Sequence, residues 1–151
     1  MQAALGRIAL RKLPGWVATR RKHATLLTES LCHLPGLRIT VPPQHINHAY
    51  YKYYMFVRSD MLKTGRDRDW IMSAINAEGI PCYSGSCSEI YLEKAFVKAG
   101  LSPSHCLPIA RELGETSLLL LIHPTLLPEH LENTCNIVAE VMKKATGDKT
   151  H

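Results

Sequence analysis

The feature that most constrains the fold is an unbroken apolar run from Leu118 to Ile122, and no apolar run in the chain is longer. A short run of this kind is typical of a fully buried strand. It is far shorter than the ~20 apolar residues that a membrane-crossing helix needs. We therefore predict a buried strand over 117–122 and exclude a transmembrane protein.

Other segments have the composition of further strands. Residues 37–41 are a short candidate closed by Pro42-Pro43, and 50–58 is a stronger one because it holds five of the ten aromatic residues. Aromatic side chains suit a pleated, half-buried surface. Both faces of 50–58 are apolar, which predicts a strand covered on both sides. Residues 80–83 begin another extended segment.

The first third of the chain has helical periodicity. Apolar residues recur on one stripe over 2–33, namely Leu10, Leu13, Val17, Ala24, Leu27 and Leu31. Pro14-Gly15 interrupts the pattern, because proline lacks an amide donor and disfavours helical geometry at the residue before it. We expect either a kink there or two abutting helices.

Three shorter helices and a long last helix complete the predicted elements. The three shorter helices are predicted over 67–78, 90–99 and 108–113, the first ended by Gly79 and the third by Gly114. The last helix begins at Pro128. Its predicted inward stripe is Leu131, Cys135, Val138 and Met142. The order predicts an α+β fold, a small antiparallel or mixed sheet flanked by helices. We divide the chain into a helical connector over 1–34, a small domain over 35–146 and a polar tail over 147–151.

Positive charge is concentrated at the front of the chain. Six of the 18 basic residues precede the first acidic residue, Glu29, so the other 12 accompany 13 acidic residues. Few aromatic residues are interleaved with these charges, which favours a solvated helix face or a contact with another part of a larger protein over a nucleic-acid interface. No membrane or nucleic-acid partner is expected.

The five cysteines are odd in number and irregularly spaced. A disulfide framework normally has an even, dense set, so we expect free thiols in a reducing cytoplasm. His45 and His48 follow two prolines and are not expected to share a metal on a helix. Cys82, Cys87, His105 and Cys106 lack the paired spacing of a structural zinc site. We therefore predict no metal.

The segment from Tyr83 to Tyr91 is the main candidate site. It concentrates hydroxyl groups, a carboxylate and a glycine in an irregular stretch, and polar groups on a loop held by a scaffold are a common form of binding site. An ordinary surface loop is the alternative. His123, directly after the buried strand, is a second candidate, with a turn histidine bonded to backbone as its alternative.

Several short motifs, taken in order, resemble one family. They are Met1-Gln2-Ala3-Ala4 with Gly6 and Leu10; Arg20 or Arg21 with Ala24; His48 with Tyr50 and Tyr51; Arg68-Asp69 with Gly79-Ile80; and His123-Pro124-Thr125-Leu126. In this order they resemble the C-terminal part of the DegT/DnrJ/EryC1/StrS aminotransferases. These pyridoxal-phosphate enzymes aminate keto sugars attached to nucleotides. Residues 82–96 differ from the Tyr/His-rich stretch of many members.

The resemblance implies a small domain of such an enzyme, acting in amino-sugar or polysaccharide biosynthesis. In the family the cofactor domain, with its Schiff-base lysine, precedes the first of these motifs, so these 151 residues alone are expected to bind no pyridoxal phosphate and to be inactive. The expected partners are that cofactor domain or a homodimer partner, and a nucleotide-sugar substrate. The implied substrate-binding residues are His48, Tyr83, Ser84, Ser86, Glu89, Tyr91 and His123. The alternative is a non-enzymatic interaction or regulatory module that retains the small-domain fold.

Overall fold

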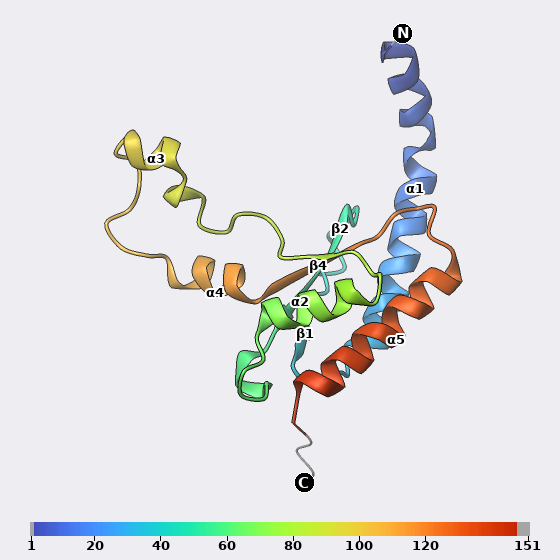
Figure 1. Ribbon diagram of the computed structural model, residues 1–151. Coiled ribbons are helices and arrows are strands. Elements are labelled where there is room, and N and C mark those ends of the chain that lie inside the picture. The colour runs from blue at the N-terminus through green and yellow to red at the C-terminus, as the bar shows by residue number, and fades with distance from the viewer. Residues whose placement is uncertain (1, 148–151) are drawn as a thin grey trace.

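The computed structural model describes residues 2–147, which form five helices and a four-stranded sheet (Figure 1). The helices are α1 (Gln2–Leu31), α2 (Arg68–Ala77), α3 (Lys94–Lys98), α4 (Pro108–Thr116) and α5 (Pro128–Ala145). The strands are β1 (Leu37–Ile39), β2 (Lys52–Val57), β3 (Cys82–Tyr83) and β4 (Ser117–Leu121). Single 3₁₀ turns, η1 (Ser59–Met61) and η2 (Ile90–Leu92), lie between them. The tail expected over 147–151 lies outside the described residues except for Gly147.

The sheet is antiparallel throughout, in the order β1-β2-β4-β3. The apolar run therefore forms an inner strand, with β2 on one side and β3 on the other. Tyr54 of β2 and Tyr83 of β3 both pair with Leu119. The α+β prediction is confirmed. Of the antiparallel and mixed sheets that the sequence left open, the structure has the antiparallel one.

The two faces of the sheet are covered differently. Tyr53, Met55 and Val57 of β2 are at most 4% exposed, beneath α1, α2 and α5, and α2 and α5 lie in front of the sheet in Figure 1. The alternate residues Lys52, Tyr54 and Phe56 are only half-buried. The prediction that both faces of β2 are covered was therefore wrong. Among the described residues, α4 and the loop after β3 lie against this more open face.

Helix α1 is one unbroken helix through Pro14, so the two-helix alternative was wrong. The carbonyl that loses its amide partner belongs to Leu10, in a segment open to water, which can satisfy it. Only the second half of the predicted stripe is buried, at Ala24, Leu27 and Leu31, whereas Leu10 is 68% exposed. The first half of α1 extends beyond the rest of the molecule in Figure 1.

The helix ends follow local sequence signals with one exception. The side chain of Asp67 accepts a hydrogen bond from the Trp70 amide at 2.7 Å and caps α2, and Gly79 follows that helix with a φ of 82°. Helix α5 begins at Pro128, and its predicted stripe is buried. Gly114 does not end α4, which continues to Thr116. Strand β1 is also shorter than the predicted 37–41.

Candidate functional site

The loop that follows β3, residues 84–91, is fixed to the open face of the sheet. The Ser117 hydroxyl at the start of β4 donates to the Ser84 carbonyl at 2.5 Å. The hydroxyl groups of Ser86 and Tyr54 are 3.0 Å apart and share a hydrogen bond. The loop is thus attached to two neighbouring strands, so its polar groups have a defined position.

Two glycines make this close attachment possible. Gly85 has a φ of 85°, and a Cβ added there would lie 2.9 Å from the Tyr54 ring and 3.0 Å from the Ser117 hydroxyl. Gly114, inside α4, leaves the space that the Ser88 side chain occupies. A larger residue at position 85 would displace the loop from the sheet, and an added Cβ at position 114 would crowd the Ser88 side chain.

Arg68 of α2 stabilises the junction between α4 and β4, against which the loop packs. Its guanidinium donates to the carbonyls of Gly114 and Ser117, at 3.2 and 3.1 Å, and pairs with Asp69 at 2.6 Å. The α4–β4 junction on which the loop rests is therefore tied to the N-terminal end of α2.

Glu89, Tyr91 and Cys106 form a hydrogen-bonded cluster at the far end of the loop. The Tyr91 hydroxyl donates to Glu89 Oε1 at 2.6 Å, and Cys106 Sγ approaches the same oxygen at 3.3 Å. The bond from Tyr91, followed by that from Cys106, lowers the pKa of the Glu89 carboxyl. The same bond to Glu89 raises the pKa of Tyr91 to about 12. At neutral pH the cluster thus presents a carboxylate and a protonated phenol.

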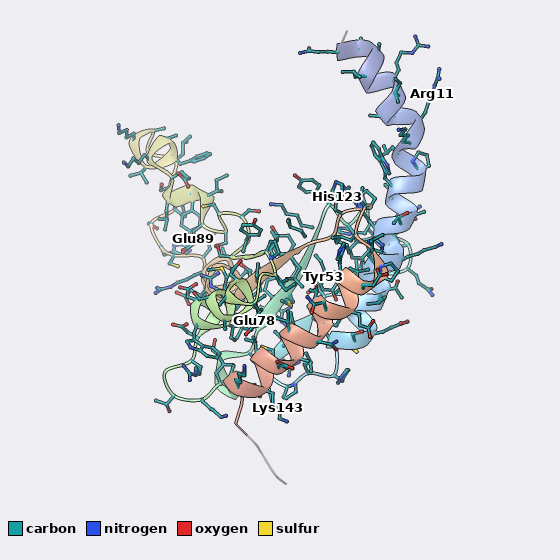
Figure 2. All side chains as sticks on the ribbon, turned by 45° about the vertical axis from the view of Figure 1, so that its right-hand side comes forward. Arg11, Tyr53, Glu78, Glu89, His123 and Lys143 are labelled. Atoms are coloured by element: carbon teal, nitrogen blue, oxygen red, sulfur yellow. The ribbon has the colours of Figure 1, made fainter. Side chains whose placement is uncertain are left out.

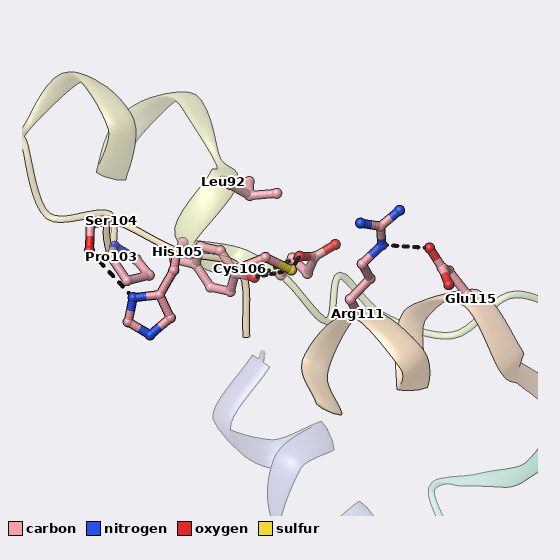
Figure 3. Close-up of a pocket in the computed structure, with 9 residues that line it drawn as sticks. Leu92, Pro103, Ser104, His105, Cys106, Arg111 and Glu115 are labelled. Carbon is pink, nitrogen blue, oxygen red and sulfur yellow. Dashed lines mark hydrogen bonds and ion pairs between the residues drawn. The ribbon is translucent and has the colours of Figure 1, made fainter. Parts of the chain in front are cut away.

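Two open hollows adjoin this loop. A hollow of about 480 Å³ lies between α4, with Arg111 and Glu115, and the segment Ser104 to Cys106 (Figure 3). Arg111 and Glu115 pair at 2.8 Å. A second hollow, of about 330 Å³, is lined by Ser84 to Glu89 and by the same face of α4. The loop therefore places hydroxyl groups, a carboxylate and a guanidinium around accessible space.

The structure separates the predicted site residues into two groups. Ser84, Ser86, Glu89 and Tyr91 line the hollows beside α4, whereas Tyr83 is half-exposed on edge strand β3. His48 and His123 lie near the other end of the sheet, because Lys52 pairs with Leu121. In the register of β3 and β4, Leu118 lies level with Ser84. His123 is five residues further along the chain, which corresponds to roughly 17 Å of extended backbone. Figure 2 shows Glu89 and His123 well apart.

His48 and His123 both make local hydrogen bonds. His48 Nδ1 accepts from the Tyr50 amide at 3.2 Å, and its carbonyl accepts from Arg21 at 2.9 Å. His123 Nδ1 lies 2.7 Å from the Thr125 hydroxyl and accepts a longer hydrogen bond, of 3.4 Å, from the Thr125 amide. His123 thus has the backbone contact of the turn-histidine alternative. His48 in addition lines a hollow of about 240 Å³ together with Ser86, so the loop and His48 meet there.

Sequence reasoning missed several residues that the fold brings to these hollows. Cys106, Arg111 and Glu115 are 15 or more residues from Glu89 in the chain, and no local pattern connects them. Lys52 and Tyr54 lie in the segment 50–58, which the sequence predicted only as a strand. Within residues 2–147 no group of three His, Cys, Asp or Glu side chains is arranged to hold a metal ion. No helix in the same range is long and apolar enough to cross a membrane.

Comparison with known proteins identifies the family. The model of the DegT/DnrJ/EryC1/StrS aminotransferase family matches residues 1–139. The chain belongs to this family. The resemblance seen in the sequence motifs is thereby confirmed.

Similar aminotransferases share both fold and sequence with this family member. The chain superposes on an aminotransferase from Psychrobacter cryohalolentis with a TM-score of 0.85 and 42% identity, over 95% of this chain and 38% of that one. S. venezuelae DesV, solved with a ketimine intermediate, gives a TM-score of 0.81 and 26% identity, over 95% and 36%. A dTDP-4-dehydro-2,3,6-trideoxy-D-glucose 4-aminotransferase from Saccharopolyspora spinosa is 27% identical over 135 residues, 83% of this chain and 30% of the relative. The chain thus spans about a third of the length of these relatives.

Proposed function

We propose that this chain is the substrate-binding domain of an enzyme that transfers an amino group, normally from glutamate, to a keto sugar attached to a nucleotide. The observation that supports this proposal most directly is the loop 84–91. It is held against the sheet and α4 by Ser117, Tyr54 and Gly114, and it presents its polar groups to open hollows.

The groups on this loop suit a sugar. Sugar hydroxyls both donate and accept hydrogen bonds, and they are recognised by a few well-placed polar groups beside apolar or aromatic surfaces. Glu89 offers a carboxylate acceptor, Ser86 a hydroxyl group and Tyr91 an aromatic ring. The loop would orient the keto sugar, and the family cofactor would supply the amino-transfer chemistry.

The described residues do not fit pyridoxal phosphate. A site for this cofactor needs a lysine for the covalent attachment and an acid for the ring nitrogen. Lys52 lines a hollow with Ser86 of the loop, and no carboxylate lines that hollow. We therefore propose that the cofactor is bound by a part of the enzyme other than these residues, and we assign no catalytic residue here.

We further propose that the product is an amino sugar on a nucleotide, a precursor for polysaccharides, made in the cytoplasm. The five unpaired cysteines are consistent with this location.

A chimeric enzyme tests the proposed function. Residues 1–151 replace the matching portion of the Psychrobacter cryohalolentis aminotransferase, and conversion of glutamate to 2-oxoglutarate is measured with keto-sugar nucleotides. Glu89→Ala is expected to raise KM by about ten- to a hundredfold, because a charge-assisted hydrogen bond contributes about 1.5–3 kcal/mol. His123→Ala is expected to have a smaller effect. Cofactor absorbance stays unchanged in both variants.

Glu78→Ala, on an exposed acid at the end of α2, is the matched control and should keep the parent KM. A chimera that binds the cofactor but aminates no keto-sugar nucleotide would contradict the proposed function. Parent-like KM values in both Glu89→Ala and His123→Ala would remove these residues from the substrate wall.

A further inference from the structure

The side chain of Asn76, in the last turn of α2, is bonded to β3 as a neighbouring strand would be. Its amide nitrogen donates to the Cys82 carbonyl at 2.8 Å, and its amide oxygen accepts from the Cys82 backbone N–H at 3.1 Å. The same nitrogen donates to the Met72 carbonyl, also at 2.8 Å. One side-chain amide therefore makes three hydrogen bonds, and two of them hold a single residue of the strand.

These bonds lie on the outer edge of β3, which is an edge strand of the sheet. In an antiparallel strand the N–H and C=O groups of one residue point to the same side. Because Asn76 bonds both groups of Cys82, they point away from β4. An amide suits this place because it carries a donor and an acceptor side by side, as a peptide group does. Asn76 thus replaces the strand that the edge lacks.

Strand β3 is too short to hold its position by pairing with β4 alone. It consists of Cys82 and Tyr83, and the loop 84–91 follows directly. The Cys82 side chain is 2% exposed in the core, and Asn76 fixes the backbone on the opposite edge. Ser84, the first residue of the loop, is two residues from Cys82. A change in the position of Cys82 is therefore passed directly to the loop.

Helix α2 also holds the second support of the loop. Arg68, its first residue, has a side chain that is 16% exposed and donates to the carbonyls of Gly114 and Ser117. The Ser117 hydroxyl donates in turn to the Ser84 carbonyl. Helix α2 thus reaches Ser84 by two routes, one through Cys82 and one through Ser117.

The end of α2 does not account for the bonds between Asn76 and Cys82. The amides of Glu78 and Gly79 bond to the carbonyls of Ile75 and Asn76, and these backbone bonds close the helix. The bond from the Asn76 side chain to Met72 is also internal to the helix. The two bonds to Cys82 act on the strand instead.

We propose that Asn76 is a positioning residue for the substrate, which acts through Cys82 to set where Ser84, Ser86 and Glu89 of the loop lie. The proposal rests on the proposed function, because that function makes the loop 84–91 the site of the keto sugar. Asn76 lines neither of the two hollows beside α4, so it acts through the strand and does not touch the substrate there.

Steady-state kinetics of the chimeric enzyme test this role. Asn76→Leu removes all three hydrogen bonds at similar size, and Asn76→Asp places an acceptor against two carbonyls. Each is expected to raise KM for the keto-sugar nucleotide by about three- to tenfold, as loss of a neutral hydrogen bond implies. KM for glutamate and cofactor absorbance should stay at the parent values. A general loss of structure would change these quantities too.

A double variant shows whether the effect passes through the loop. Asn76→Leu should raise KM less in the Glu89→Ala background than in the parent, because residues that act through one another are not additive. Asn136→Leu and Asn136→Asp change an exposed asparagine of α5 and are the matched controls. Both controls should keep the parent KM.

Hydrogen exchange in the 151-residue chain tests the positioning without turnover. Amides of residues 83–89 should exchange faster in Asn76→Leu than in Asn136→Leu, whereas the core amides of β2 should exchange at the parent rate in both. This measurement requires neither the cofactor nor a substrate.

Three results would overturn the role of Asn76. They are a parent-like KM in both Asn76 variants while Glu89→Ala raises KM, an equal rise of KM in the parent and Glu89→Ala backgrounds, and exchange that accelerates equally in the loop and in β2. Each of these leaves the proposed function standing. A chimera that aminates no keto-sugar nucleotide would instead count against the proposed function, and the exchange comparison would then decide whether Asn76 positions the loop.

Discussion

Replacing Gly114 by alanine tests the contact between α4 and the loop. A glycine inside a helix normally destabilises it by about 0.5–1 kcal/mol relative to alanine, so the substitution should ordinarily stabilise the protein. Here the new Cβ meets the Ser88 hydroxyl and lies 3.3 Å from Ser88 Cβ. The hydroxyl can rotate away, but the second contact remains. We expect the low end of the 1–3 kcal/mol range for overpacking, which cancels the gain.

Gly15→Ala is the matched control. Gly15 also lies inside a helix, and an added Cβ would meet nothing within 4 Å. The free energy of unfolding, measured in urea, should rise by about 0.5–1 kcal/mol for Gly15→Ala and stay level or fall for Gly114→Ala. The expected difference between the two variants is therefore about 1 kcal/mol.

Hydrogen exchange shows where the cost arises. In Gly114→Ala, amide exchange should accelerate over residues 84–89 and stay slow at the core amides of β2. Adding Ser88→Gly, which removes both contacting atoms, should restore slow exchange in the loop. Equal stabilisation by both alanine variants, with unchanged loop exchange, would refute the view that Gly114 holds the loop.

Three other measurements follow from the charges, thiols and exposed surfaces. The pKa of the Glu89 carboxyl is lowered in the folded chain, so its hydrogen bonds stabilise residues 89–107 fully above the ordinary pKa of 4.5. This stabilisation should be lost as the pH falls through the lowered pKa. NMR shifts of Tyr91 should report the loss. Thiol titration should find five free thiols, and elemental analysis should find no zinc. Exposed Cys32 and Cys106 should react fast, and exposed Cys87 more slowly, because a hydrogen bond with Glu93 raises its pKa. Reaction should also be slow at buried Cys82, whose pKa burial raises to about 11, and at buried Cys135. The exposed apolar residues at the front of α1 should make the chain self-associate or leave residues 5–13 rapidly exchanging; a strict monomer with slow exchange there would contradict this.

The core could be predicted from the sequence because its signals are local. The apolar run at 118–122, the helical stripe after Pro128 and the cap at Asp67 each require only neighbouring residues. The effect of Pro14 could not be predicted, because whether a proline breaks a helix depends on whether water can reach the freed carbonyl. The role of Gly114 could not be predicted either, because it depends on Ser88, which is 26 positions earlier in the chain.

The candidate site was only partly predictable for the same reason. The hydroxyl-rich composition of 83–91 indicated the loop, and most of these residues line hollows. The partners that shape the loop, Tyr54, Ser117 and Arg111, come from three other elements. The bonds between Asn76 and Cys82 depend on where α2 lies beside β3, which no periodicity reveals.

The pairing of β3 with β4 has a consequence for how relatives can diverge. Tyr83 and Leu119 are partners in adjacent antiparallel strands, so the chain leaves the sheet and returns to it at points about 5 Å apart. The segment between them, which includes α3 and most of the candidate sugar site, is a long insertion whose two ends are fixed by the sheet. Its length and composition can change without altering the span that the core must close. Substrate preference and core stability are thereby free to evolve separately.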